Sequence, residues 1–273
     1  MGLKDEAIRK NIEEILEIED NSRIATNVYK MVLKGNTDTL TNPGQFINIK
    51  IPGFYLRRPI SVCDYEPGRL TIIYKVVGNG TDAMTAMKPG DRLNALMGLG
   101  NGFDVSLAGD SPLLVGGGVG TPPMYGLAKK LAEMGKKVNV IIGFNTADEV
   151  FYKDEFEAIT DKNGNKCVNL YVATVDGSVG TKGFVTNCVD LVGDISHYYA
   201  CGAIPMLKAL NKKLTEASKE GKYKVSNLGQ LSYEERMGCG FGACVGCSIK
   251  TKSGNKRVCK DGPIFLSTDV EVE

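Results

Sequence analysis

Four cysteines in the last fifth of the chain, with glycines between them, limit its folding more than any other feature. Cys239, Cys244, Cys247 and Cys259 have the spacing C-x4-C-x2-C-x11-C. The first three positions follow the ligand pattern of plant-type [2Fe–2S] centres. A loop must wrap closely around such a cluster, and glycine permits the backbone angles while leaving amide hydrogens free to point at the sulfur atoms. The run therefore predicts a [2Fe–2S] site.

A four-cysteine zinc site is the structural alternative for the same run. Structural zinc usually takes cysteine pairs separated by two to four residues, a pattern that Cys259 does not follow. The segment 222–273 is too short to bury much of a core, so a metal is expected to hold it together. The amino terminus resembles no secretory signal. We therefore expect a cytoplasmic protein, in which a disulfide framework is disfavoured.

Residues 17–108 have the texture of short strands and turns. Isoleucines alternate with polar residues over 47–51, and the run 70–76 is rich in strand-forming residues. Pro-Gly pairs mark turns at 43–44, 52–53, 67–68 and 89–90. This pattern predicts a small antiparallel barrel or sandwich.

Residues 109–221 alternate between strand and helix. Apolar side chains recur at helical spacing over 124–131 and 185–192, and the first of these helices should stop at Gly135. Strands that alternate with helices predict a parallel sheet covered on both faces. The strands are expected at 113–115, 138–144, 168–173 and 198–201.

A glycine-rich turn follows the first of these strands. Residues 113–124 run from a strand through glycines into a helix, with Thr121 as the expected N-cap and Pro122 in the first turn. Free amides and the helix dipole favour a pyrophosphate there. Residues 200–206 form a second loop of this kind. Two such loops at one sheet edge predict a nucleotide-binding crevice, with tight turns that bind nothing as the alternative.

The barrel segment offers a second candidate anion site. Arg58 follows one expected strand, and Gly80 and Thr81 follow another. A fixed guanidinium can hold a phosphate bidentately, and a glycine turn can offer amides to the same anion. Arg57 and Arg58 as an ordinary surface pair are the alternative.

Composition excludes several classes of function. The formal net charge is +1, so no basic surface for nucleic acid is predicted. No apolar stretch is long enough for a membrane span. His197 is the single histidine, which excludes sites that need two imidazoles. No general base is identified, so no catalytic residue is predicted, and Cys63, Cys167 and Cys188 are interpreted as packing residues.

Taken in order, these motifs resemble the electron-transfer subunits of NAD-dependent dihydroorotate dehydrogenase B, within the ferredoxin–NADP reductase superfamily. The resemblance covers nearly all of the chain after about residue 17. It implies an antiparallel FAD-binding β-barrel over 17–108, a parallel α/β NAD-binding domain over 109–221 and a small C-terminal [2Fe–2S] domain over 222–273. Residues 1–16 are left as an N-terminal extension, with no role assigned beyond a solvated helix. The motifs that carry the resemblance are Arg58-Pro-Ile-Ser61, Gly80-Thr81, the 116–120 loop, Cys201-Gly202 and the tail 234–263.

The same resemblance implies site residues, motif by motif. Ile60 stands where the superfamily often has an aromatic residue, so the side chain that covers the flavin face is not identified. FAD would be held by Arg58, Pro59, Ile60, Ser61, Ile73, Tyr74, Lys75, Gly80 and Thr81. The nicotinamide nucleotide would be held by Gly116, Gly117, Gly118, Val119, Gly120, Thr121, Cys201 and Gly202. The cluster ligands would be Cys239, Cys244, Cys247 and Cys259.

A partner is implied as well. Electrons from dihydroorotate would leave the FMN of a TIM-barrel catalytic subunit, cross the cluster and FAD, and reduce NAD+ in pyrimidine (UMP) biosynthesis. The expected assembly is a heterotetramer of two copies of each subunit. Because electron transfer needs close cofactors, the cluster segment should lie at the interface, with Phe241 and Val245 as contacts.

Two other functions stay open from the sequence. The small subunit of an NADH-dependent ferredoxin–NADP oxidoreductase has the same plan, although the Cys239–Cys244 spacing favours the dihydroorotate family. A non-enzymatic nucleotide- and zinc-binding regulatory module is the alternative of another class. The choice between NAD and NADP is also open, because Asn145 and Thr146 after one strand supply neither a ribose-binding acid nor a phosphate-binding arginine.

Overall fold

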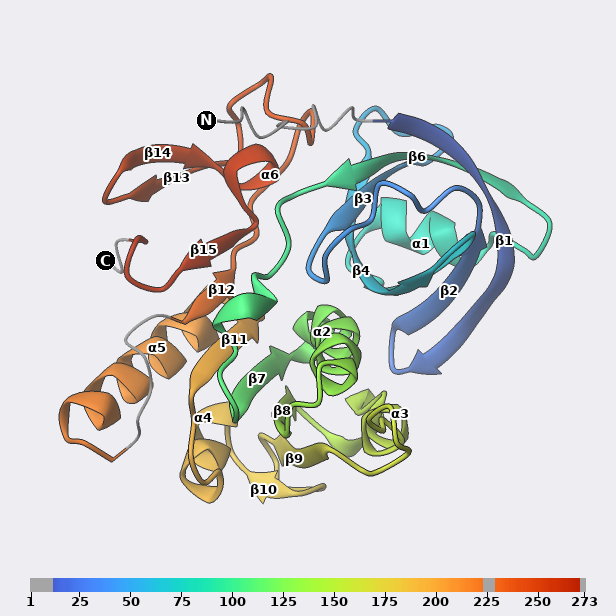
Figure 1. Ribbon diagram of the computed structural model, residues 1–273. Coiled ribbons are helices and arrows are strands. Elements are labelled where there is room, and N and C mark those ends of the chain that lie inside the picture. Colours follow the sequence, from blue (N-terminus) through green and yellow to red (C-terminus); the bar gives the residue numbers. More distant parts are fainter. Residues whose placement is uncertain (1–11, 223–228, 271–273) are drawn as a thin grey trace.

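Six antiparallel strands close into a barrel in the first part of the chain (Figure 1). The computed structural model describes residues 12–222 and 229–270. The barrel order is β1-β2-β5-β4-β3-β6, and the short helix α1 (Asn79–Thr85) places Met84 in the barrel core. The strands are β1 (Ile12–Ala25), β2 (Val28–Lys34), β3 (Phe46–Lys50), β4 (Arg58–Glu66), β5 (Arg69–Lys75) and β6 (Arg92–Leu99).

The alternation in β3 decides which side chains face the barrel interior. Ile47 and Ile49 are fully buried in the barrel core. Phe46 and Asn48 point to the opposite face, since successive side chains of a strand alternate. They are nevertheless 3% and 1% exposed, because the rest of the molecule covers this outer face.

The expected helix at the amino end is wrong for residues 12–16. These residues begin strand β1, which pairs with β6 from Ile12 opposite Met97 to Glu17 opposite Arg92. Ile12, Ile15 and Leu16 have helical spacing, but pairing along β6 satisfies the backbone, and Leu16 enters the barrel core. Residues 1–11 of this extension lie outside the described residues.

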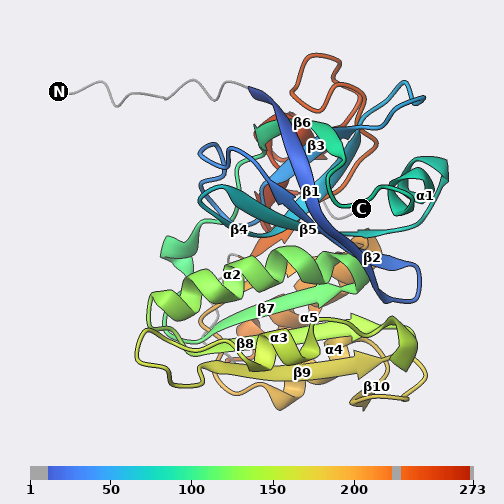
Figure 2. The same cartoon turned by 90° about the vertical axis from the view of Figure 1, so that its right-hand side faces the viewer.

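A seven-stranded sheet packs below the barrel (Figures 1 and 2), and its first six strands are parallel. Helices α2 (Thr121–Glu133) and α3 (Lys153–Glu157) cover one face, and α4 (Val185–Cys188) and α5 (Ile204–Lys219) cover the other. The prediction of a parallel sheet covered on both faces is confirmed. The order is β10 (Thr181–Lys182), β9 (Val168–Thr174), β8 (Val138–Phe144), β7 (Pro112–Gly117), β11 (His197–Cys201), β12 (Gln230–Ser232) and antiparallel β15 (Ile264–Leu266).

One of the expected helices is divided in the structure, and the other ends where the sequence predicted. The helical spacing over 185–192 is divided between α4 and the 3-10 turn η4 (Val189–Leu191), and Cys188 is fully buried as expected. Helix α2 ends just before Gly135, whose φ is +77°, a left-handed conformation that favours glycine at a helix end.

The carboxyl-terminal segment contributes to two structures. Strands β12 and β15 extend the large sheet, whereas β13 (Ser248–Thr251) and β14 (Gly254–Arg257) form a separate hairpin that leads into α6 (Val258–Asp261). The remaining short helices are η1 (Val105–Leu107), η2 (Gly118–Gly120) and η3 (Ala147–Glu149).

Helix α2 lies directly against barrel strand β4. A Cβ at Gly126 would approach the carbonyl oxygen of Cys63 to 2.6 Å, so only glycine permits this contact. The Lys129 ammonium pairs with the Asp64 carboxylate at 2.5 Å one turn farther along. On another edge, Lys75 of β5 pairs with Glu149 at 3.2 Å. These contacts join the barrel to the α/β sheet.

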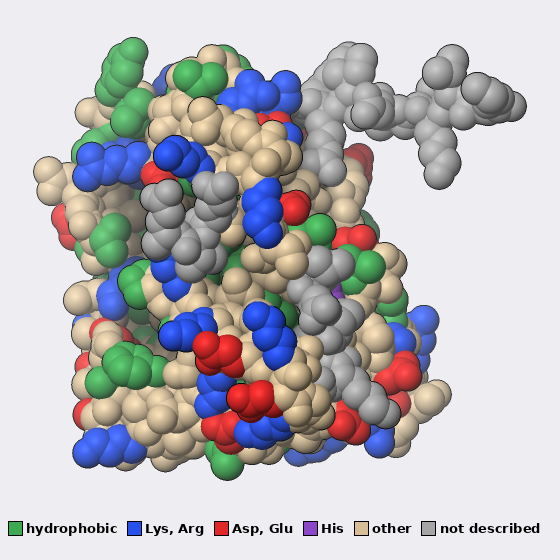
Figure 3. All heavy atoms as spheres, turned by 90° about the vertical axis from the view of Figure 1, so that its left-hand side faces the viewer, with side chains coloured by type: hydrophobic (Ala, Val, Ile, Leu, Met, Phe, Trp, Pro, Cys, Tyr) green, Lys and Arg blue, Asp and Glu red, His purple; other side chains and the backbone are tan. Residues whose placement is uncertain are grey.

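The surface has mixed charge. Acidic and basic side chains lie close together on the lower part of the face shown in Figure 3, as expected for a net charge of +1. In the described ranges, no helix is long and apolar enough to cross a membrane.

His197 makes the stability of the fold pH-dependent. Burial lowers its pKa from 6.5 to about 4, and its Nε2 lies 3.2 Å from Nε2 of Gln230, so the neutral imidazole accepts this amide hydrogen. Between pH 6.5 and 4 the unfolded chain binds a proton that the folded chain does not. Stability from this group is complete above pH 6.5 and is lost as the pH falls towards 4.

We expect wild type to lose about 2–3 kcal/mol more unfolding free energy than His197→Gln between pH 7 and pH 4.5. Urea unfolding of both proteins at the two pH values measures the difference, and carboxylates common to both cancel. Equal losses would show that His197 is protonated in the folded state.

Candidate functional site

A crevice of about 360 Å³ opens where the carboxyl ends of the parallel strands meet the barrel. This is the position at which open parallel sheets bind ligands. All three parts of the chain contribute to its wall. The lining residues are Phe46, Pro59, Ser61 and Lys75 of the barrel, Gly117–Gly120 and Cys201–Ala203 of the sheet, and Ser232–Glu235, Met237 and Pro263 of the tail.

The two glycine loops of the sheet touch each other in this crevice. A Cβ at Gly120 would lie 2.1 Å from the carbonyl oxygen of Cys201, and one at Gly117 would lie 2.4 Å from Sδ of Met206. Strand β7 pairs in parallel with β11, with Gly116 opposite Cys201. The two loops predicted for one nucleotide site are therefore side by side, and glycine is what lets them approach.

The expected N-cap of α2 is wrong. Gly120 occupies the N-cap position without a side-chain hydrogen bond, and Thr121 is the first helical residue. The turn η2 carries the chain into the helix one residue earlier than the capping pattern indicates. Thr121 is buried against Gly116, and its Oγ1 has no hydrogen-bond partner among the described residues.

The barrel residues predicted to bind a phosphate lie close together in the structure. Gly80 lies in the first turn of α1 beside Arg58, and a Cβ at Gly80 would lie 2.3 Å from Nε of that arginine. The guanidinium also lies 5.1 Å from the centroid of the Phe54 ring. Thr81 closes the turn, because its Oγ1 accepts the amide hydrogen of Val77 at 3.0 Å. A guanidinium beside a glycine turn is an arrangement that fits a phosphate.

The other barrel residues divide by strand alternation. Pro59, Ser61 and Lys75 line the crevice. Ile60 and Tyr74 pack with the barrel core instead, and Ile73 packs against the α2 side of the sheet. The structure therefore does not bring the side chains of these last three residues into the crevice.

Tyr74 has a structural environment of its own. Its hydroxyl donates to Oδ1 of Asn21 at 3.0 Å, and its ring stacks on Tyr29. Burial raises the pKa of Tyr74 to about 12. It is therefore a neutral hydrogen-bond donor at physiological pH.

The four cysteines of the tail lie in two pairs. The amide hydrogens of Ala243 and Cys244 point at Sγ of Cys239, with N–S distances of 3.2 and 3.4 Å. Sγ of Cys247 lies 3.2 Å from Sγ of Cys259. A [2Fe–2S] cluster takes two thiolates on each iron, so two adjacent pairs fit it. In the described part of the chain, no three His, Cys, Asp or Glu side chains are grouped around one metal-ion position.

The two pairs differ in their electrostatics. At Cys239, burial favours the neutral thiol, but amide hydrogens of Cys244, Phe241 and Ala243 outweigh it and lower the pKa. At Cys259, burial and the neighbouring Cys247 raise the pKa. Cys244 is exposed, whereas Cys247 and Cys259 are buried. One side of the cysteine loop therefore faces outwards.

Cys201 lines the crevice. Burial raises the pKa of its thiol to about 12, so it is neutral at physiological pH. Sequence reasoning missed Phe46 and the tail residues Ser232–Glu235, Met237 and Pro263 as crevice lining. The sequence signal for the tail residues was their position, because Glu234 and Glu235 lie just before the cysteine run. No local sequence pattern marked Phe46 as a crevice residue, because only the pairing of β3 with β4 brings it opposite Ser61.

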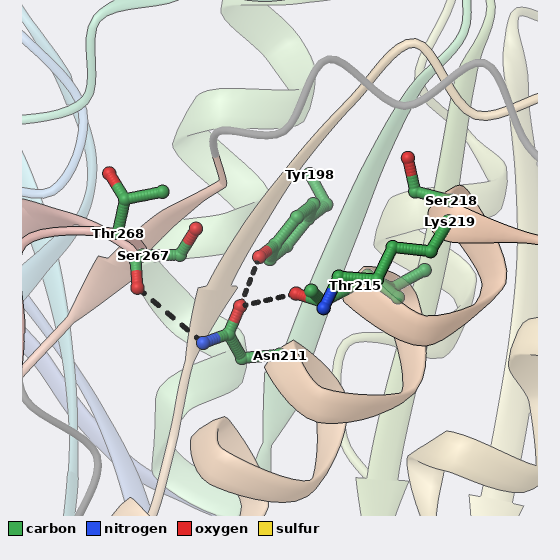
Figure 4. Close-up of a pocket in the computed structure, with 8 residues that line it drawn as sticks. Tyr198, Asn211, Thr215, Ser218, Lys219, Ser267 and Thr268 are labelled. Atoms are coloured by element: carbon green, nitrogen blue, oxygen red, sulfur yellow. Dashed lines mark hydrogen bonds between the residues drawn. The ribbon is translucent and has the colours of Figure 1, made fainter.

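A second cavity of about 310 Å³ lies between α5 and the sheet (Figure 4). Asn211 is its central polar group. Oδ1 of Asn211 accepts from the Tyr198 hydroxyl at 2.6 Å, and its Nδ2 donates to the carbonyl of Ser267 at 3.5 Å. These hydrogen bonds join α5 to β11 and to the chain after β15, so we interpret the cluster as structural.

Family models match two parts of the chain. Residues 234–271 match the iron–sulfur cluster binding domain of dihydroorotate dehydrogenase B, and residues 114–212 match an oxidoreductase NAD-binding domain. The first range includes all four paired cysteines, and the second includes both glycine loops.

Similar proteins match most of the chain. The electron transfer subunit of dihydroorotate dehydrogenase B (NAD(+)) from Fusobacterium nucleatum subsp. nucleatum is 45% identical, over 94% of this chain and 97% of that protein. The subunit of the same name from Bacillus cereus is 42% identical, over 90% and 93%.

Solved structures show the same architecture. An NADH-dependent reduced ferredoxin–NADP oxidoreductase structure superposes with a TM-score of 0.80 at 30% identity, covering 94% of this chain and 89% of that chain. A ferredoxin NADP+ reductase from Neisseria gonorrhoeae with bound FAD and NADP has a TM-score of 0.62 at 14% identity, covering 75% and 90%, and supports the fold alone.

Proposed function

This chain belongs to the family of electron transfer subunits of dihydroorotate dehydrogenase B, and we propose that it carries electrons from a catalytic subunit to NAD+ through a [2Fe–2S] cluster and FAD. The catalytic subunit would oxidise dihydroorotate, a step of pyrimidine biosynthesis. The observation that carries the proposal is that the barrel, the nucleotide loops and the cysteine tail all line one crevice.

The residues of this chain would hold cofactors rather than react. Arg58 and the Gly80 turn fit an FAD phosphate. The loop Gly116–Thr121 and its neighbour Cys201–Gly202 would bind the nicotinamide nucleotide. When bound, a flavin exchanges hydride with nicotinamide and single electrons with an iron–sulfur cluster. The chain's part is to position these groups and to keep water from the buried cysteine pair.

The catalytic partner of this family is proposed here to be an FMN-containing TIM barrel, in a heterotetramer of two copies of each subunit. A dihydroorotate site needs its own pocket and base, and a TIM barrel alone takes about 250 residues. The described residues, with two nucleotide-type sites and a cysteine loop, leave no segment for such a barrel.

An alternative function has one observation in its favour. The 30% identity to an NADH-dependent reduced ferredoxin–NADP oxidoreductase extends over 94% of this chain. Co-purification from the native source distinguishes the two functions. A dihydroorotate-oxidising flavoprotein supports our proposal, and a large flavoprotein with further iron–sulfur clusters supports the alternative.

We expect Arg58→Ala to weaken FAD binding about 10- to 100-fold, because it removes charge-assisted hydrogen bonds of about 1.5–3 kcal/mol. Arg57→Ala is the matched control, since the Arg57 guanidinium bonds instead to Asn94 and Glu13. Equilibrium dialysis with FAD measures both. Equal weakening in the two variants contradicts the assignment of Arg58.

Cys244→Ser should abolish the cluster while FAD remains bound, because thiolate ligation is lost at an exposed position outside the barrel. Cys167→Ser is the control, as Cys167 is distant in sequence and packs against the sheet core. Iron content and the visible spectrum report the outcome. A colourless wild-type protein that contains zinc would reject the redox function itself.

The isolated chain should oxidise NADH with an artificial electron acceptor such as ferricyanide, yet form no orotate from dihydroorotate, since that oxidation needs the pocket and the base that we assign to the catalytic subunit. Steady-state assays before and after addition of the catalytic subunit test this. Appreciable orotate formation by the isolated chain would refute the division of labour.

The face around the exposed Cys244 is the proposed docking surface for the catalytic subunit. Phe241 and Val245 are 43% and 60% exposed there. Phe241→Lys and Val245→Lys should weaken co-purification at least tenfold, because each places a charge in an apolar contact. Phe184→Lys is the control, since Phe184 is 66% exposed beside α4. Unchanged co-purification of both loop variants would place the interface elsewhere.

A further inference from the structure

Asn48 is a buried polar residue between the barrel and the cysteine loop. It lies on β3, 1% exposed, on the outer face that the tail covers. Its Nδ2 donates to the carbonyl oxygen of Cys239 at 3.4 Å. A carbonyl oxygen only accepts hydrogen bonds, so this contact fixes the orientation of the amide. The other amide atom, Oδ1, has no hydrogen-bond partner among the described residues.

The same residue adjoins the crevice-lining strand. Asn48 pairs with Pro59 across β3 and β4, and the next outward-facing pair is Phe46 with Ser61. Phe46, Pro59 and Ser61 all line the crevice. Asn48 is therefore one strand away from the proposed flavin site and one hydrogen bond away from the cysteine loop.

The loop approaches Asn48 without an intervening side chain. Gly240 has φ of +79°, and a Cβ there would lie 2.2 Å from Nδ2 of Asn48. The backbone of Asn48 is held in turn, since Nη1 of Arg57 donates to its carbonyl at 3.3 Å and to Oδ1 of Asn94 at 2.6 Å. Asn48 is therefore held by close contact of its side chain with Gly240 and by the hydrogen bond of its backbone with Arg57.

A buried amide oxygen without a partner costs free energy, whereas an apolar side chain of similar shape costs none. Packing alone would therefore be served as well by leucine. The hydrogen bond from the amide to the carbonyl of Cys239 explains why an asparagine is at this position. The neighbouring amides of Ala243 and Cys244 reach Sγ of Cys239 only if this loop keeps its course.

We propose that Asn48 is a positioning residue that fixes the Cys239 loop against strand β3, which pairs with the crevice-lining strand β4, and so sets the electronic environment of the cluster and its electron exchange with FAD. The inference rests on the proposed function. Asn48 acts through Cys239, because hydrogen bonds to cluster sulfurs tune the cluster potential.

The test uses Asn48→Leu and Asn48→Asp in the full chain with its cofactors. Leucine keeps the branched outline of asparagine and removes the donor, and aspartate keeps the shape but places an acceptor opposite the Cys239 carbonyl. The control is Asn139→Leu, which removes a buried asparagine of strand β8 that bonds to Ser111 and Asn169. Readouts are iron and FAD content, the electron paramagnetic resonance spectrum and potential of the reduced cluster, and stopped-flow reduction by NADH.

Both Asn48 variants should retain FAD and reduce it with NADH within twofold of the wild-type rate. Their cluster spectrum and potential should change, and cluster reduction after the flavin should slow at least tenfold. Loss of iron with FAD retained in both variants, but not in the control, supports the same assignment. An unchanged spectrum, potential and rate in either iron-containing variant overturns it, as do equal effects in the control. Absence of flavin and iron from wild type rejects the proposed function instead.

Discussion

The outer face of strands β3 and β4 is the surface on which the whole molecule depends. A small barrel normally turns its outer face to water, yet Phe46 and Asn48 are almost fully buried there. The tail covers β3, and helix α2 lies along β4. Because β3 contacts the tail and its partner β4 contacts α2, the crevice and the cysteine loop lie at adjacent positions on this pair of strands. This fixes distances between sites that are far apart in sequence.

Close backbone approach is what makes these contacts possible. Gly120 lies against Cys201, Gly126 against Cys63, and Gly240 against Asn48. At each position a Cβ would collide with backbone or with a buried amide, and a packed interior tolerates such overlap poorly. The glycines therefore do more than shape turns. They set the separation between the barrel, the sheet and the cysteine loop.

The division of chemistry between protein and cofactors follows from the crevice. Its wall holds the neutral thiol of Cys201, the Lys75 ammonium paired with Glu149, the side chains of Glu234 and Glu235, and the backbone of the two glycine loops. The ammonium and the backbone amides can bind and orient anionic nucleotides, whereas the redox chemistry belongs to the cofactors. A chain of this family accordingly works with a catalytic subunit. Cys244, Phe241 and Val245 of the cysteine loop are exposed to solvent.

Local patterns in the sequence determined most of the helices and strands and the kinds of cofactor site. Alternation in β3, helical spacing in α2 and the glycine turn after β7 each depend on neighbouring residues. Three of the four cysteines likewise lie on one loop, and Cys259 follows in α6. The tertiary structure alone decided which side chains meet. It turned residues 12–16 into a strand, moved the start of α2 to Thr121, buried Tyr74 in the barrel core and packed the half-buried Ile60 against that core. It also buried Asn48 and brought Phe46 to the crevice, because strand pairing and burial involve residues far apart in the chain, and no local pattern records those contacts.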